Sequence, residues 1–180
     1  MTDPARAAAI EAGLASADPE DVYDAIIDIG KQGHPELADR VVPFLTSATG
    51  FLREAAVRAL VFHLRLPAYK AQAIQMLTGD PDAGVRAAAA MALNTFAMTD
   101  PGLVRQLVTV ALDTAEQEAV REAAFLAALV GAGIERPEFP KAAWVPGFER
   151  NADWGLLARA LGRAGIAVPP GLAERAASPR

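Results

Sequence analysis

The sequence contains no cysteine among its 180 residues. Disulfides, thiolate nucleophiles and cysteine-bound metals are therefore excluded, and the composition fits a reducing compartment. Aromatic residues make up only 6% of the chain, and with β-branched residues also sparse we expect no β-sheet. Basic residues are outnumbered, 17 Lys and Arg against 22 Asp and Glu, and this balance argues against a nucleic-acid partner.

Long apolar segments are also missing. The longest candidate lies between Arg86 and Asp100 and is interrupted by Asn94 and Thr95, whereas a membrane-spanning helix needs about 18 consecutive apolar residues. The first residues lack the basic region and the apolar core of a signal peptide. We therefore expect a cytoplasmic protein without a membrane partner.

Alanine-rich helical patterns dominate what is present. Hydrophobic residues make up 52% of the chain, enough for a continuous core, and alanine has the highest helix propensity. Residues 82–97 show the pattern most clearly, because six mostly small side chains recur at helical spacing on one face. These are Val85, Ala88, Ala89, Ala92, Leu93 and Phe96. Such a helix can lie close to a neighbour along its length.

Four Asp-Pro pairs divide the chain, at Asp3, Asp18, Asp80 and Asp100. The aspartate can cap the first free N–H groups of a helix, while proline is well suited to the first helical position. Short connections between helices favour antiparallel neighbours and hence stacked hairpins. Helices are predicted at residues 4–16, 19–31, 35–46, 51–65, 67–78, 82–97, 101–113 and 117–131.

One short pattern occurs repeatedly along the chain. Segments 52–56, 85–89 and 120–124 align without gaps, and their arginines are 33 and 35 positions apart. A degenerate copy begins at Val22, where Tyr23 replaces the arginine. This period is typical of helical-hairpin repeat proteins.

The Val-Arg-x-Ala-Ala-x-x-Ala-Leu pattern and the passage from Ala25 to Leu45 resemble HEAT repeats. The short bacterial type, also found in phycobilin-lyase-like proteins, is the most similar. The resemblance covers residues 4–131 and implies an all-α fold, a right-handed α-solenoid (α-α superhelix) of about four HEAT-like hairpins. It leaves function open, because the motif concerns packing.

The HEAT pattern also implies an aspartate that pairs with each arginine across the turn. Asp80 stands in the matching place before Arg86, whereas Ser47 and Ala115 stand there before Arg53 and Arg121. The expected series of Asp–Arg pairs is therefore incomplete in this sequence.

The C-terminal residues depart from the repeat. Three prolines between residues 135 and 150 prevent a long helix there, and Asn151 or Asp153 is expected to cap a helix that follows. We predict a repeat solenoid over residues 1–134 and a C-terminal cap on the last repeat over residues 135–180, with a separate binding arm as the alternative.

No convergent catalytic set is visible. His34 and His63 have no second histidine or carboxylate at ligand spacing on the same helix face, so we expect no metal, no cofactor and no enzyme. The alternative is a HEAT-like enzyme, either a bilin-lyase-like protein or a nucleic-acid base glycosylase. Only the region from Trp144 to Trp154 supplies the aromatic surface that such an enzyme needs.

Column-by-column comparison of the repeats predicts stripes along a concave surface, because the second helices of successive hairpins lie side by side. Within the stripes, Asp28 is expected to pair with Arg58. The arginine column has two interpretations, either bracing of helix ends and turns or docking of a partner. The predicted protein-binding residues are Tyr23, Asp24, Asp28, Arg53, Glu54, Arg58, Arg86 and Arg121.

Three like charges, Asp21, Asp24 and Asp28, share one face of residues 19–31. They repel one another, so the face is either simply solvated or is a docking site for a basic partner. Together these features predict a non-catalytic protein-protein interaction module, in an adaptor, regulatory or immunity-type role, whose partner is another protein.

Overall fold

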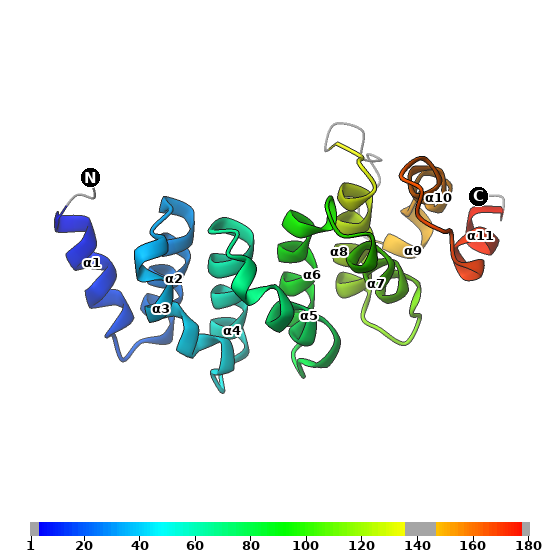
Figure 1. Ribbon diagram of the computed structural model, residues 1–180. Coiled ribbons are helices and arrows are strands. Elements are labelled where there is room, and N and C mark those ends of the chain that lie inside the picture. Colours follow the sequence, from blue (N-terminus) through cyan, green and yellow to red (C-terminus); the bar gives the residue numbers. More distant parts are fainter. Residues whose placement is uncertain (1–3, 136–146, 178–180) are drawn as a thin grey trace. The chain divides into compact units, whose positions relative to one another are not determined.

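The computed structural model describes residues 4–135 and 147–177, with side chains from residue 8 onward, and every regular element in these ranges is helical (Figure 1). The predicted all-α class is thus confirmed for the described part of the chain. The elements are α1 (Pro4–Leu14), α2 (Pro19–Gln32), η1 (Pro35–Leu37), α3 (Ala38–Val41), η2 (Val42–Thr46), α4 (Gly50–Val57), η3 (Arg58–His63), η4 (Pro67–Tyr69), α5 (Lys70–Gly79), α6 (Ala83–Ala97), α7 (Pro101–Leu112), α8 (Glu118–Gly131), α9 (Phe148–Asn151), α10 (Trp154–Arg163) and α11 (Pro170–Ala177).

The chain forms two compact units, residues 1–92 and residues 93–180, and the boundary lies within α6. Each unit has its own buried core. The division predicted between residues 134 and 135 stays a prediction, since residues 136–146 lie outside the described ranges.

Within the first unit, α1 packs on α2, and α2 packs on α4 and η3, so that these helices stand side by side (Figure 1). Two glycines permit the close approach. A Cβ added at Gly13 of α1 would lie 2.8 Å from the Ala25 Cβ of α2, and one added at Gly30 of α2 would lie 2.8 Å from the Ala59 Cα. Small residues therefore set the spacing of α2 from its neighbours on both sides.

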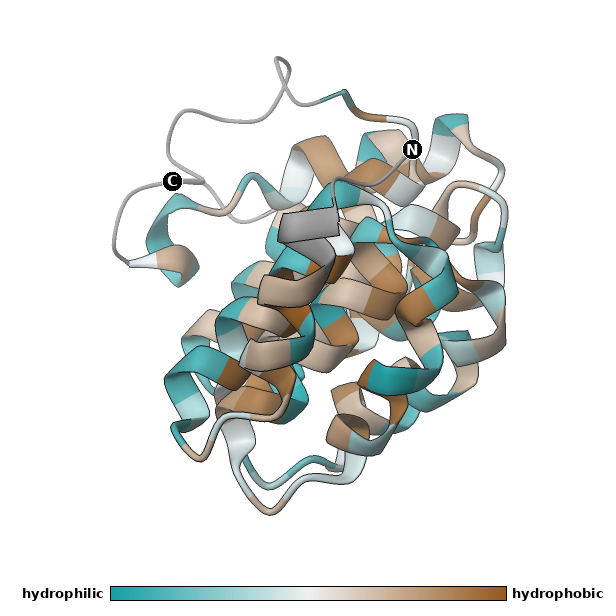
Figure 2. Cartoon of the chain, turned by 90° about the vertical axis from the view of Figure 1, so that its left-hand side faces the viewer, coloured by the Kyte–Doolittle hydropathy of each residue, from teal (hydrophilic) through white to brown (hydrophobic). Residues whose placement is uncertain are grey.

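The hydropathy of α2 explains its position in the core. Ile26 and Ile29 are completely buried, while Asp21 and Asp24 on the opposite face are exposed. An apolar stripe of this kind drives a helix into a layered stack. Figure 2 shows the same alternation of apolar and polar residues along the helices.

Of the four predicted Asp-Pro helix starts, two are confirmed, one is wrong, and the one at Asp3 lies outside the described residues. Asp18 accepts a hydrogen bond from an N–H group of α2 at 2.9 Å, and Asp100 accepts one from α7 at 3.0 Å. Asp80 does not cap α6. Asp82 does so instead, accepting from the Gly84 N–H at 2.7 Å, because α6 begins at Ala83, one residue after Asp82.

Residues 35–46 and 51–65 were each predicted as one helix, and both predictions are wrong in detail. The first segment divides into η1, α3 and η2, because Pro43 cannot donate a backbone hydrogen bond. The second changes from α4 to the π-helical η3, where the Leu64 N–H binds the Ala59 carbonyl, five residues back, at 2.9 Å.

In the second unit, α7 packs on α8, and α8 contacts α9 and α10. Three aromatic rings join these elements: Phe125, Phe148 and Trp154 make edge-to-face contacts with centroids 5.1–5.5 Å apart. Asp153 caps α10 as predicted, accepting from an N–H group at 2.7 Å. The sequence did not predict α11, which packs on α10.

Candidate functional site

The arginine column makes contacts within the fold. Arg53 donates from Nε and Nη2 to the two carboxylate oxygens of Asp80, at 2.8 and 2.7 Å. Its Nη1 donates to the Ser47 carbonyl at 2.8 Å. The Arg53 side chain is 12% exposed and that of Asp80 only 5%. Arg53 therefore joins the turn before α4 to the turn before α6.

Arg86 and Arg121 make comparable contacts. The Arg86 Nη1 donates to the Asp80 carbonyl at 2.7 Å. Arg121 is buried, donates from Nε to the Ala111 carbonyl at 3.1 Å, and pairs with Glu149. Each of the three arginines thus binds a backbone carbonyl N-terminal to its own helix, which supports the structural interpretation of the column.

The predicted ion pair between Asp28 and Arg58 is wrong. Arg58 pairs instead with Glu54, one turn earlier on the same helical stretch, with 3.0 Å between Nη1 and Oε1. A partner at i−4 is reached without spanning two helices. Asp28 instead lines a groove that α2 forms with α1.

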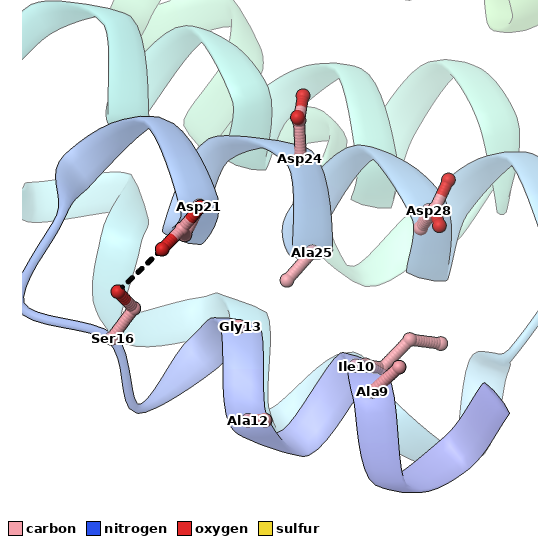
Figure 3. Close-up of a pocket in the computed structure, with 9 residues that line it drawn as sticks. All are labelled: Ala9, Ile10, Ala12, Gly13, Ser16, Asp21, Asp24, Ala25 and Asp28. Carbon is pink, nitrogen blue, oxygen red and sulfur yellow. Dashed lines mark hydrogen bonds between the residues drawn. The ribbon is translucent and has the colours of Figure 1, made fainter. Parts of the chain in front are cut away.

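A groove of about 450 Å³ lies between α1 and α2 (Figure 3). Its apolar lining is small, and Figure 3 shows Ala25 directed toward Gly13, whereas Asp24 and Asp28 point away from α1. The lining residues are Ala9, Ile10, Ala12, Gly13, Ser16, Asp21, Asp24, Ala25 and Asp28. The groove therefore has an apolar floor of small residues, and the carboxylates of Asp24 and Asp28 stand at its rim, directed away from α1.

The carboxylates of this groove differ in their contacts. Asp21 accepts a hydrogen bond from the Ser16 hydroxyl at 2.8 Å. Asp24 and Asp28 make no hydrogen bond or ion pair with any residue in the described ranges. Because the two are one turn apart on the same helix, they repel each other and together attract a cation.

On its other side, α2 forms a second pocket with the start of α4. This pocket has a volume of about 360 Å³ and is lined by Glu20, Tyr23, Asp24 and Phe51. The rings of Tyr23 and Phe51 lie 5.7 Å apart between centroids and are inclined by 40°. Asp24 borders both the groove and this pocket.

The family model for HEAT repeats matches residues 7–94. These residues are a HEAT-repeat segment. The groove and the pocket both lie inside the HEAT segment, which is all-helical as the resemblance implied. The handedness of the solenoid and its number of hairpins stay predictions. No curated protein and no solved structure matches the chain at a level that indicates relatedness.

The two histidines of the HEAT segment have ordinary structural contacts. His34 is buried and its Nδ1 lies 2.9 Å from Glu36 Oε1. Burial lowers the pKa of His63, and the charges of Arg58 and Lys31 lower it further, which favours the neutral ring. Among the described residues there is no group of three or more His, Asp or Glu side chains placed to hold a metal.

The aromatic region that the enzymatic alternative requires is only partly described. Trp144 lies outside the described ranges. Trp154 is 7% exposed and its ring packs against Phe125 and Phe148, while the Arg175 guanidinium lies 5.0 Å from the ring centroid. This tryptophan therefore belongs to the core of the second unit. No helix in the described ranges combines the length and the apolarity needed to cross a membrane.

Sequence reasoning found part of this surface. Tyr23, Asp24 and Asp28 were predicted, and the structure brings Tyr23 and Asp24 together in the pocket and Asp24 and Asp28 together in the groove. Glu20 and Phe51 were missed. Phe51 directly precedes the aligned repeat, so it lay in none of the compared columns, although an aromatic residue next to the repeat was a signal available in the sequence.

Proposed function

We propose that the chain is a non-catalytic protein-interaction module, and that the groove between α1 and α2 binds a basic segment of another protein. The observation that carries this proposal is the combination of the apolar groove floor with the two unpaired carboxylates, Asp24 and Asp28. An apolar floor with a charged rim is the usual composition of a peptide-binding groove.

The charge distribution supports a basic partner. Residues 1–50 hold nine acidic and three basic residues, whereas residues 51–100 hold four and five. The negative field is therefore concentrated on the end of the HEAT segment that forms the groove. Complementary charge steers encounter and fixes the register of a bound segment. HEAT-type solenoids also present extended surfaces that are suited to protein ligands.

The predicted concave stripe is thereby divided into two parts. Tyr23, Asp24 and Asp28 remain in the proposed binding surface. Arg53 and Arg121 have their guanidinium groups bound to other residues of the fold, so their substitution would disturb the protein itself. Loss of a partner on substitution of these arginines would therefore not show that they form a docking surface.

Affinity capture from the source cells tests the proposal with two charge-matched variants. The groove variant is Asp24→Asn/Asp28→Asn, and the control is Asp39→Asn/Glu118→Gln, which removes two exposed charges elsewhere. We expect a protein with a basic segment to be held by the wild type and by the control and to be lost by the groove variant. Its binding should also weaken as salt rises.

Reconstitution with the purified partner completes the test. Truncation of the basic segment should abolish binding, and a peptide of that segment should compete. A partner that binds the groove variant as well as the wild type would place the interaction on another surface and contradict the proposal.

A further inference from the structure

The pocket between α2 and α4 has a composition that the groove lacks, because it places two aromatic rings beside two carboxylates. Glu20, Tyr23 and Asp24 come from the first two turns of α2, and Phe51 comes from the first turn of α4. Its volume of about 360 Å³ is at the lower end for ligand pockets. This size suits a single side chain.

Neither carboxylate has a partner of its own. Glu20 and Asp24 form no side-chain hydrogen bond or ion pair with another residue in the described ranges. Both residues are exposed, so a cation can pair with their carboxylates without the large free-energy cost of removing buried charges from water. The pocket therefore carries two unneutralised negative charges.

The two rings supply a surface for the same cation. Tyr23 and Phe51 are half-buried, with centroids 5.7 Å apart and an inclination of 40°. A cation over the face of either ring lies within the roughly 6 Å at which the ring quadrupole attracts it. The rings and the carboxylates thus both favour a cationic ligand.

We infer that this pocket binds the guanidinium group of an arginine side chain of the partner's basic segment. The inference rests on the proposed function, since it assigns one side chain of that segment to one pocket. A guanidinium is planar and weakly hydrated, so it stacks on a ring face while its edge donates to carboxylates. The compact ammonium of lysine is more strongly hydrated and has no planar face to stack, so it binds such a pocket more weakly.

The N-terminal end of α2 opposes a cation only weakly. Its macrodipole is equivalent to about half a positive charge, whereas Glu20, Asp21 and Asp24 place three carboxylates in its first two turns. The net field at the pocket is therefore negative.

A titration of the full chain with three capped tripeptides tests the inference. The peptides are acetyl-Gly-X-Gly-amide, where X is arginine, lysine or citrulline, the neutral analogue of arginine. Two-dimensional ¹⁵N–¹H NMR at low ionic strength measures the affinity. We expect saturable shifts for the arginine peptide centred on Tyr23, Asp24 and Phe51, with the lysine peptide about fivefold weaker and the citrulline peptide without saturation.

Matched variants locate the site. Asp24→Asn and Phe51→Leu should each weaken the arginine peptide about fivefold, whereas Asp28→Asn, which removes the same charge from the groove alone, should leave its affinity unchanged. Glu20→Gln serves as a further pocket variant, because the Glu20 side chain is exposed and its loss leaves the core intact. Helicity by circular dichroism verifies that each variant is folded.

The outcomes separate this inference from the proposed function. Equal binding of arginine and lysine peptides, or binding that Phe51→Leu does not change, would overturn the pocket assignment. If the protein partner is lost by Asp24→Asn/Asp28→Asn but held fully by Phe51→Leu, the groove proposal stands and the arginine pocket fails. If the arginine peptide binds the pocket while no partner depends on the groove, the proposed function fails and the guanidinium site remains.

Discussion

Arg53 and Asp80 form a bidentate ion pair across 27 positions of the sequence, with Nε–Oδ2 and Nη2–Oδ1 distances of 2.8 and 2.7 Å. The same carboxylate accepts the Asp82 N–H at 2.9 Å, and the Asp80 carbonyl accepts a hydrogen bond from Arg86. One aspartate thus connects the arginines of two successive repeats. This pair is part of the structure of the first unit.

Replacement of Asp80 by asparagine should strongly destabilise the chain. The substitution leaves the nearly buried Arg53 guanidinium without its counter-charge, and breaking a buried pair in this way costs about 3 kcal/mol. Urea denaturation followed by circular dichroism measures the free energy of unfolding. Asp39→Asn, at an exposed site, is the control and should change it by less than about 0.5 kcal/mol. Equal effects of the two substitutions would show that the pair contributes little.

The pair should also make stability depend on pH. Burial by itself raises the pKa of Asp80, but hydrogen bonds from Arg53 and the Asp82 N–H, with the charges of Arg53 and Arg86, bring it below its ordinary value. A lowered carboxylate pKa stabilises the fold above the unfolded pKa of about 3.9, and this contribution is lost as pH falls through the folded pKa. Between pH 6 and about pH 3 the wild type should therefore lose more stability than Asp80→Asn. Parallel curves would contradict this.

The partner of Arg53 could not be predicted from the sequence. The repeat spacing identified Arg53 as a column residue, but its partner lies 27 positions away, and the family pattern directed attention to Ser47 instead. Ser47 does contact Arg53, through its carbonyl and not its side chain. A residue type at fixed spacing predicts a side chain's place on a helix, whereas its partner is determined by how the hairpins stack.

Helix boundaries were predictable to the extent that local chemistry determines them. The start of α2 follows from Asp18 and Pro19, and its end from Gly33, which has a φ of 73°. The π-helical turn η3, which packs against α2, was not predictable, because no local sequence signal marks a hydrogen bond that reaches five residues back. The pocket at Phe51 could not be predicted either, because its prediction requires knowing which helix lies beside Tyr23.

Alanine at Gly30 should destabilise the protein although alanine is the better helix former. In an open helical position the exchange stabilises by about 1 kcal/mol, but a Cβ at Gly30 would lie 2.8 Å from the Ala59 Cα. Overpacking of this kind costs about 1–3 kcal/mol. Gly79→Ala is the matched control, since nothing lies within 4 Å of its added Cβ, and it should be neutral or stabilising. Thermal unfolding of the two variants gives the comparison.

Removal of the Trp154 ring should destabilise the second unit. The residue is 7% exposed, and its ring contacts Phe125 and Phe148 with centroids 5.1 and 5.5 Å away. Truncation of such a residue costs about 3–5 kcal/mol. Met98→Ala, at a residue that is 68% exposed, is the control and should have little effect. Urea denaturation distinguishes the two; a small loss at Trp154 would mean that residues 148–177 contribute little to this core.

Substitution of a carboxylate that serves binding and not folding should stabilise the protein, unlike the three destabilising substitutions described above. Asp24 and Asp28 are one turn apart and have no partner in the described chain, so Asp28→Asn should raise the free energy of unfolding by about 0.3 kcal/mol and reduce its dependence on salt. Asp21→Asn should lower it instead, because Asp21 accepts from Ser16 and lies near the positive end of α2. Urea is the denaturant to use, since it adds no ions. A loss of stability in Asp28→Asn would mean that this carboxylate has a structural role, and the groove would then lose its main argument.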